Sequence, residues 1–222
     1  MSIVDMPRRP IGTHSTGSVA RVCAALAELA SGATVVVFDD RDDQADLVLA
    51  AEHATTAELE FMIRHTGGFV QVALTHSDCV RLQLPPMWGL NDANVQSGPT
   101  VTVDAAAGIG TGISAADRAL TIRTVADPTT RPDDLTRPGH VAPVKATGAA
   151  TTDPGVVDAV VHLMGAAGLR TVAALSTLVS PQDETRMATR EESRAFAAEH
   201  GLAFVTTNDA VVHAGAAATR PA

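Results

Sequence analysis

The chain has no tyrosine, one tryptophan and only 3% aromatic residues among its 222 positions. Proteins that bind single-stranded nucleic acid stack bases on aromatic side chains, so this class is disfavoured. Basic residues are also few: 16 Lys and Arg stand against 25 Asp and Glu, a formal net charge of −9. Binding to a phosphate backbone requires a basic face, and we therefore expect no nucleic-acid partner.

Cysteines and long apolar runs are scarce as well. Cys23 and Cys79 have neither the density of a disulfide scaffold nor the spacing of a metal motif. No apolar run approaches the length of a membrane span. The first 15 residues lack the apolar stretch of a signal peptide. These absences predict a cytoplasmic protein with no membrane partner.

The chain does contain enough apolar residues for one sizeable core. Its hydrophobic fraction is 45% and its charged fraction 18%, values typical of globular proteins. A mass of 22.8 kDa fits one domain. We interpret residues 1–15, which are rich in Pro, Arg and Ser, as a flexible leader. Residues 16–222 are interpreted as a single domain.

Helix and strand patterns alternate along this domain. The predicted helices cover residues 18–31, 55–66 and 156–167, one that begins at 114, residues 191–200, and a short helix near 209. The predicted strands cover residues 34–38, 47–51, 69–74, 100–104, 171–178 and 203–206. Residues 76–98 and 127–155 are predicted to be loops. This order favours an α/β or α+β domain with a layered sheet.

An acidic stretch joins the first two predicted strands. Five aspartates and Arg41 lie within eight positions from Asp39 to Asp46. Carboxylates crowd together at low cost only where they face water, a cation or a cationic substrate group. The stretch is therefore either a solvated loop or part of a site.

A histidine and a glycine-rich segment are further candidates. His140 lies in the sequence RPGHV, where Pro138 stiffens the chain and Gly139 permits a close backbone approach. Imidazole titrates near neutrality and suits proton transfer. Thr111 lies in GIGTGIS before a predicted helix. That segment lacks the lysine of a nucleotide-binding loop, which argues against nucleotide binding.

The order of several segments resembles the 3,4-dihydroxy-2-butanone-4-phosphate synthase family over about residues 18–213. These segments are LTHSDCVRLQLPPM, TVTVDAAAGIGTGISAADRALTIR, LTRPGHVAPV and AAGLRTVAAL. The resemblance implies an α+β fold (a layered α/β sandwich) and a homodimer whose active sites lie at the subunit interface. It also implies the Mg²⁺-dependent conversion of ribulose 5-phosphate to a four-carbon riboflavin precursor and formate.

Part of the family's site pattern is retained. Arg41 and Asp46 match the acidic loop, Asp42 replaces its metal-binding glutamate, Thr111 remains from a threonine pair, and His140 is intact. The resemblance therefore assigns catalytic roles to His140, Asp42, Asp46 and Arg41, and substrate binding to Thr111.

Four other positions depart from the pattern. Asp153 replaces a phosphate-binding Arg, Val156 a metal-binding His, Val157 a phosphate-contacting Thr, and Thr177 a Glu that serves the chemistry. We expect these four residues to line the substrate site. A charge reversal repels a phosphate dianion, and valine offers no ligand to a hard cation.

These departures favour a repurposed enzyme. It would act without a metal or other cofactor, by acid–base elimination, isomerisation or cyclisation of a less polar, non-phosphorylated carbonyl or enol compound of a specialised pathway. One alternative is the family's synthase reaction with Mg²⁺. Another is a non-catalytic, ligand-binding relative. The expected partners are a small-molecule substrate and a second copy of the chain.

Overall fold

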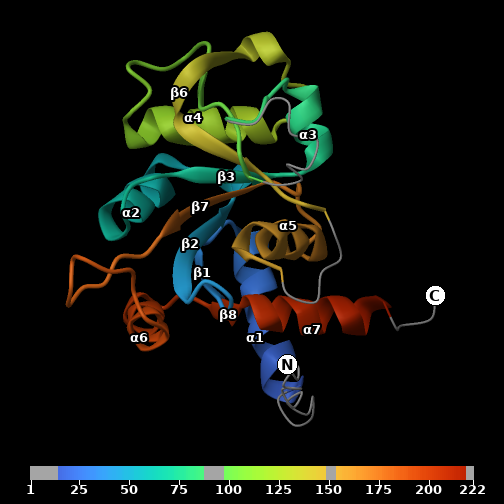
Figure 1. Cartoon of the computed structure of the whole chain (residues 1–222), viewed down its shortest axis with the longest axis vertical. Helices are drawn as coiled ribbons and strands as arrows, with labels where there is room; N and C mark the ends of the chain where they lie inside the picture. The colour runs from blue at the N-terminus through green and yellow to red at the C-terminus, as the bar shows by residue number, and fades with distance from the viewer. Residues whose placement is uncertain (1–14, 88–97, 149–153, 219–222) are drawn as a thin grey trace, which may run out of the picture.

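The computed structural model describes residues 15–87, 98–148 and 154–218 (Figure 1). The strands are β1 (Val35–Asp39), β2 (Gln44–Ala50), β3 (Gln71–Leu74), β4 (Gly98–Pro99), β5 (Val103–Ala105), β6 (Leu135–Lys145), β7 (Ala173–Thr177) and β8 (Phe204–Thr206). The α-helices are α1 (Ser15–Ser31), α2 (Thr56–His65), α3 (His76–Arg81), α4 (Ala115–Ala126), α5 (Val156–Ala166), α6 (Arg190–His200) and α7 (Thr207–Ala218). Two short 3₁₀ helices, η1 (Ala51–His53) and η2 (Pro132–Asp134), complete the described elements.

The strands form one mixed sheet with helices on both faces (Figure 1). Its order is β4-β6-β3-β7-β2-β1-β8, and β5 pairs with β6 outside this path. The β1–β8 and β3–β6 pairs are parallel, whereas the other pairs are antiparallel. One apolar core joins the sheet to α2, α4 and α6, and a second joins it to α1, α5 and α7. The result is a layered α/β sandwich.

The hairpin of β1 and β2 directs two aspartates toward the face that α5 covers. Val37 lies opposite Asp46, and Asp39 lies opposite Gln44. Successive side chains of a strand alternate between faces. Val35 and Val37 belong to the core beneath α5, so Asp39 shares that face, and Asp46 shares it because it lies opposite Val37.

Several predicted helix starts are confirmed by their caps. The hydroxyl of Thr55 accepts a hydrogen bond from the backbone N–H of Glu58, as the start of α2 requires. Ser114 does the same for α4. Thr189 and Glu192 form a reciprocal capping box at α6. These local signals fix where the helices begin.

Other predictions of secondary structure were wrong in part. The expected loop at 127–155 contains η2 and the eleven-residue strand β6. Residues 76–98 include α3, and the helix predicted near 209 runs for twelve residues as α7. Prolines and glycines suggested a loop at 135–145, but pairing with β3, β4 and β5 makes this segment a strand. Tertiary pairing here outweighs local propensity.

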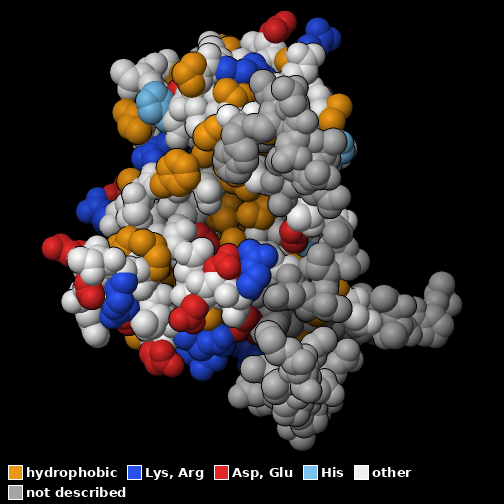
Figure 2. All heavy atoms as spheres, in the orientation of Figure 1, with side chains coloured by type: hydrophobic (Ala, Val, Ile, Leu, Met, Phe, Trp, Pro, Cys, Tyr) orange, Lys and Arg blue, Asp and Glu red, His pale blue; other side chains and the backbone are white. Residues whose placement is uncertain are grey.

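Two observations bear on partners. Acidic and basic side chains are interspersed on the face shown in Figure 2. Within the described ranges, none of the helices is long and apolar enough to cross a lipid bilayer. The predicted leader lies almost entirely outside the described residues, and the predicted single domain stays a prediction.

Candidate functional site

The end of β1 is tied to the start of α5 by Asp39. One carboxylate oxygen accepts a hydrogen bond from the backbone N–H of Val156 at 2.8 Å, and the other accepts from the backbone N–H of Arg41 at 2.9 Å. Gly155 caps α5 but has no side chain to bind the helix N–H groups. Asp39 supplies that function from another strand, and a carboxylate is favourable at a helix N-terminus.

Asp46 lies on β2 beside this junction and is 1% exposed. Its Oδ1 accepts a hydrogen bond from the hydroxyl of Thr177 on β7 at 2.8 Å. Its Oδ2 is buried and has no hydrogen-bond partner among the residues that the structure describes. Burial raises the pKa of Asp46 to about 6; the Thr177 hydrogen bond opposes this shift, and the charge of Asp39 adds to it. The carboxyl therefore exchanges protons close to neutral pH.

Arg41 and Asp42 form the exposed part of the acidic loop. The Arg41 guanidinium donates two hydrogen bonds to the Asp42 carboxylate at 3.1 and 2.9 Å. The hydrogen bond from Arg41 lowers the pKa of Asp42. Arg41 also lies against Gly155, where an added Cβ would overlap the guanidinium. The start of α5 thus limits where Arg41 can lie.

Gly155→Ala is expected to disturb the site without unfolding the chain. Gly155 has φ −70° and ψ 171°, which alanine adopts without strain. The new methyl group displaces a flexible guanidinium, so the free energy of unfolding changes by less than about 1 kcal/mol. If Arg41 positions the substrate as the sequence predicts, moving its guanidinium by about 1 Å costs on the order of 100-fold in rate, and we expect a loss of about 10- to 100-fold in kcat/KM.

Gly165→Ala is the matched control for this variant, because Gly165 lies in α5, the helix that Gly155 caps. A Cβ there meets Thr171 at an ordinary 3.5 Å. Denaturant unfolding and steady-state kinetics compare the two variants. Equal kcat/KM values for the two variants would contradict the predicted role of Arg41 in positioning the substrate.

The structure brings several of the predicted site residues together around Asp39, and we call this group the acidic cluster. Arg41, Asp42, Asp46 and Thr177 gather with the backbone of Val156 around Asp39. The side chains of Val156 and Val157 are half-buried and pack against the core beneath α5. Asp153 lies outside the described residues. Substrate contact by these residues stays a prediction.

His140 forms a separate group on β6. Its ring Nδ1 lies 2.7 Å from Oδ2 of Asp104, and its backbone N–H donates to Oδ1 of Asp104 at 2.9 Å. Thr111 is exposed on the glycine-rich loop, next to Gly112, which packs against both side chains of the pair. Sequence reasoning missed Asp104. The signal that could have revealed it lies in the run TVTVD, where valines alternate with polar residues. Asp104 continues the polar positions of Thr100 and Thr102 and places a carboxylate at the end of the predicted strand.

Within one chain, His140 and the acidic cluster lie on strands that are not neighbours in the sheet. Strands β3 and β7 lie between β6 and β2. At the usual strand spacing of 4.8 Å, this order separates β6 from β2 by about 14 Å. Within one chain His140 therefore lies apart from Arg41, Asp42 and Asp46. Their convergence at a site between two copies stays a prediction.

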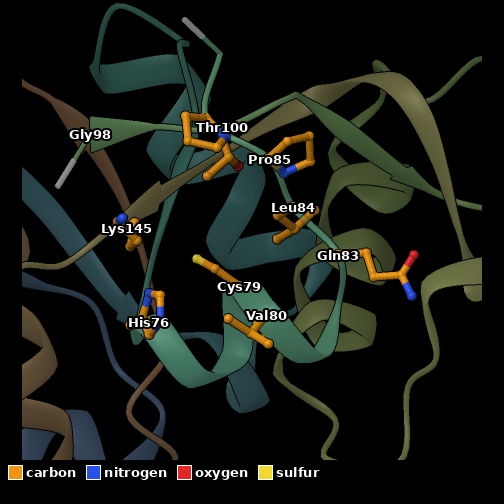
Figure 3. A pocket seen from close by; sticks show the side chains of 10 residues that line it. His76, Cys79, Val80, Gln83, Leu84, Pro85, Gly98, Thr100 and Lys145 are labelled. Atoms are coloured by element: carbon orange, nitrogen blue, oxygen red, sulfur yellow. The ribbon is translucent and has the colours of Figure 1, made fainter. Parts of the chain in front are cut away.

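A cavity of about 520 Å³ lies elsewhere, beside α3 (Figure 3). It opens at the carboxyl ends of β3 and β6, whereas Asp46 and Thr177 lie toward the amino end of β3. Burial raises the pKa of its Cys79 thiol to about 11, which disfavours a nucleophilic role. The lining residues are His76, Cys79, Val80, Gln83, Leu84, Pro85, Pro86, Gly98, Thr100 and Lys145.

Most of the chain matches a known protein family. Residues 23–213 match the sequence model of the 3,4-dihydroxy-2-butanone 4-phosphate synthase family. The chain belongs to this family. It is 48% identical to riboflavin biosynthesis protein RibBA of Nocardia farcinica over 190 residues, which cover 84% of this chain and 46% of that protein. It is 47% identical to RibBA of Mycobacterium tuberculosis (strain H37Rv), with 84% and 45% covered.

The chain thus spans about half the length of these curated relatives. Solved synthase structures are similar over more of their length. One, in complex with two magnesium ions, superposes with a TM-score of 0.81 at 35% identity and covers 90% of this chain and 99% of its own. The synthase of Candida albicans gives 0.77 at 34% identity and covers 85% and 94%. The predicted fold and family are confirmed.

The prediction of a repurposed enzyme with a less polar, non-phosphorylated substrate is wrong. Identity of 47–48% over 190 residues supports the family's own reaction instead. The prediction assumed that Val156 and Val157 line the pocket with methyl groups. Both side chains are half-buried against the core beneath α5, and their contact with a substrate stays a prediction.

Proposed function

We propose that this chain catalyses the lyase reaction of its family, converting ribulose 5-phosphate to 3,4-dihydroxy-2-butanone 4-phosphate and formate. The observation that carries the proposal is the identity of 47–48% over 190 residues to RibBA proteins. The reaction divides one ketopentose phosphate into a four-carbon ketone phosphate and formic acid without any other reactant. It therefore needs groups that move protons and groups that stabilise an enolate.

The chain offers such groups in its two clusters. The imidazole of His140, whose side chain is 40% exposed, takes and returns protons at carbons next to the ketone. Arg41 stabilises negative charge that develops on the carbonyl oxygen. Asp46, whose Oδ2 has no hydrogen-bond partner among the described residues and whose pKa is about 6, is assigned the role of accepting a substrate proton.

One similar synthase structure contains two magnesium ions, so we asked whether the described residues of this chain could hold them. Among the described residues, no three His, Cys, Asp or Glu side chains converge so that they could hold a metal ion. Both oxygens of Asp39 bind backbone N–H groups, and Asp42 is paired with Arg41. This arrangement does not fit the two ions, and the roles assigned above do not involve a metal.

The proposed active unit is a homodimer. Within one chain β3 and β7 separate β6, which carries His140, from β2, which carries Asp46. In a two-fold symmetric pair, the same patch on both copies forms the interface, so one copy's acidic cluster can face the other copy's His140. The separation of the two clusters supports this assembly.

Formate release tests the proposed reaction. The purified chain is incubated with ribulose 5-phosphate, with and without added Mg²⁺, and formate is measured through formate dehydrogenase. We expect formate to accumulate in proportion to enzyme, whereas ribose 5-phosphate without an isomerase gives none. The absence of formate under both conditions would reject the proposal.

A further inference from the structure

Asp104 contacts His140 at two points. Its Oδ1 accepts the backbone N–H of His140, and its Oδ2 lies within hydrogen-bond distance of ring Nδ1. The Asp104 side chain is 8% exposed, whereas that of His140 is 40% exposed. The carboxylate is thus enclosed on the inner side of the ring, and the outer side of the imidazole reaches solvent.

An irregularity in strand pairing creates this arrangement. Val103 pairs with Val141, but Asp104 pairs with Thr136, so four residues of β6 have no partner across β5. Gly139 belongs to these four residues, and an added Cβ there would overlap the backbone of Val103 and Asp104. Gly139 also donates its N–H to the hydroxyl of Thr102 at 3.1 Å. Bulges of this kind re-aim side chains near functional sites.

The glycine-rich loop encloses the pair from the other side. Gly112 has φ +90°, and an added Cβ would overlap both Oδ2 of Asp104 and Nδ1 of His140. Asp117 holds the loop by accepting the N–H groups of Gly110 and Gly112 at 3.2 and 3.0 Å. Backbone without side chains therefore lies directly on the Asp104–His140 contact.

We propose that Asp104 is a positioning residue that holds His140 as its Nδ1–H tautomer and presents Nε2 to the substrate. A carboxylate accepts hydrogen bonds but donates none when ionised. The neutral ring must then carry its proton on Nδ1, which leaves the Nε2 lone pair free. The kinetic part of this inference rests on the proposed function, whereas the tautomer is a property of the protein alone.

Asp104→Asn tests the inference with little change in shape. Asparagine has one acceptor oxygen, and the backbone N–H of His140 already requires an acceptor. The amide NH₂ then faces ring Nδ1 and favours the Nε2–H tautomer. In a Ser-His-Asp triad the corresponding change lowers kcat by about 10⁴ through the wrong tautomer. Here we expect a fall of about 100-fold or more in kcat for formate release, with KM changed by less than about threefold.

The tautomer of His140 and the kcat for formate release together test the role of Asp104. Two-bond ¹H–¹⁵N correlation spectra of histidine-labelled protein at pH 8, assigned with a His140→Gln sample, report the tautomer of His140. We expect Nδ1–H in the parent chain and Nε2–H in Asp104→Asn. Asp133→Asn is the matched control, because Asp133 is an exposed aspartate of η2, and we expect both its tautomer and its kcat to match the parent.

The outcomes separate the two proposals. An Nε2–H tautomer in the parent chain overturns the inference, as does an unchanged kcat in Asp104→Asn when the parent releases formate. A parent chain that shows the Nδ1–H tautomer, changed by Asp104→Asn, but releases no formate supports Asp104 as the holder of the ring and rejects the proposed reaction.

Discussion

Replacing His140 by alanine is expected to lower kcat for formate release by about 10²–10⁴, the range that one general acid–base group contributes. The variant removes the ring but leaves Asp104 enclosed by Gly112 and Gly139. KM should change little, because the imidazole acts mainly in the transition state. Steady-state kinetics with ribulose 5-phosphate measure both constants.

His76→Ala is the control for loss of a histidine. His76 is exposed at the start of α3, beside the cavity and away from both clusters. We expect it to keep the parent kcat. A His140→Ala variant that also retains parent kcat would remove this residue from the proposed chemistry.

Mixing variants tests whether the two clusters act across a dimer interface. His140→Ala and Asp46→Asn are each expected to be inactive alone. If each site takes His140 from one copy and Asp46 from the other, half of the mixed dimers are heterodimers with one intact site. After denaturation and joint refolding, activity should return to about one quarter of the parent value. No recovery in mixtures shown to be dimeric would place each site within a single copy.

Asp46→Asn is expected to stabilise the protein near neutral pH while it abolishes activity. The pKa of Asp46 is raised from 3.8 to about 6 in the folded state. A raised carboxyl pKa contributes stability that is complete below the unfolded-state value and is lost as pH rises through the folded-state value. A difference of about 2 pH units corresponds to about 3 kcal/mol. Asparagine carries no charge and avoids this loss.

Urea unfolding at pH 4 and pH 8 measures the effect. Between these values, the free energy of unfolding of Asp46→Asn should gain about 3 kcal/mol relative to the parent chain. Asp133→Asn, at an exposed position, should show no such gain. A pH-independent difference between Asp46→Asn and the parent would mean that the buried carboxyl does not titrate in this range.

Much of the fold was predictable because local chemistry and tertiary structure agree. The run Val35–Phe38 has no polar face, and it forms a strand buried on both sides. Thr55 and Ser114 cap helices where their sequences place them. By contrast, β6 contains Pro138 and Gly139, and its strand structure depends on pairing partners that local patterns do not reveal.

The site was predictable only in part for a similar reason. Arg41, Asp42 and Asp46 lie close in sequence, and one hairpin keeps them close in space. The contact between Asp104 and His140 joins positions 36 residues apart through a shift in pairing register, and no local pattern encodes it. Strand order, which follows from the complete topology, separates His140 from the acidic cluster.

Isotope-traced product analysis tests the proposed function most directly. Uniformly ¹³C-labelled ribulose 5-phosphate is incubated with the chain and followed by ¹³C NMR. We predict equal amounts of labelled formate and of a four-carbon ketone phosphate, with no other labelled product. Recovery of unchanged or merely isomerised five-carbon phosphate, without formate, would contradict the assignment of the family's lyase reaction to this chain.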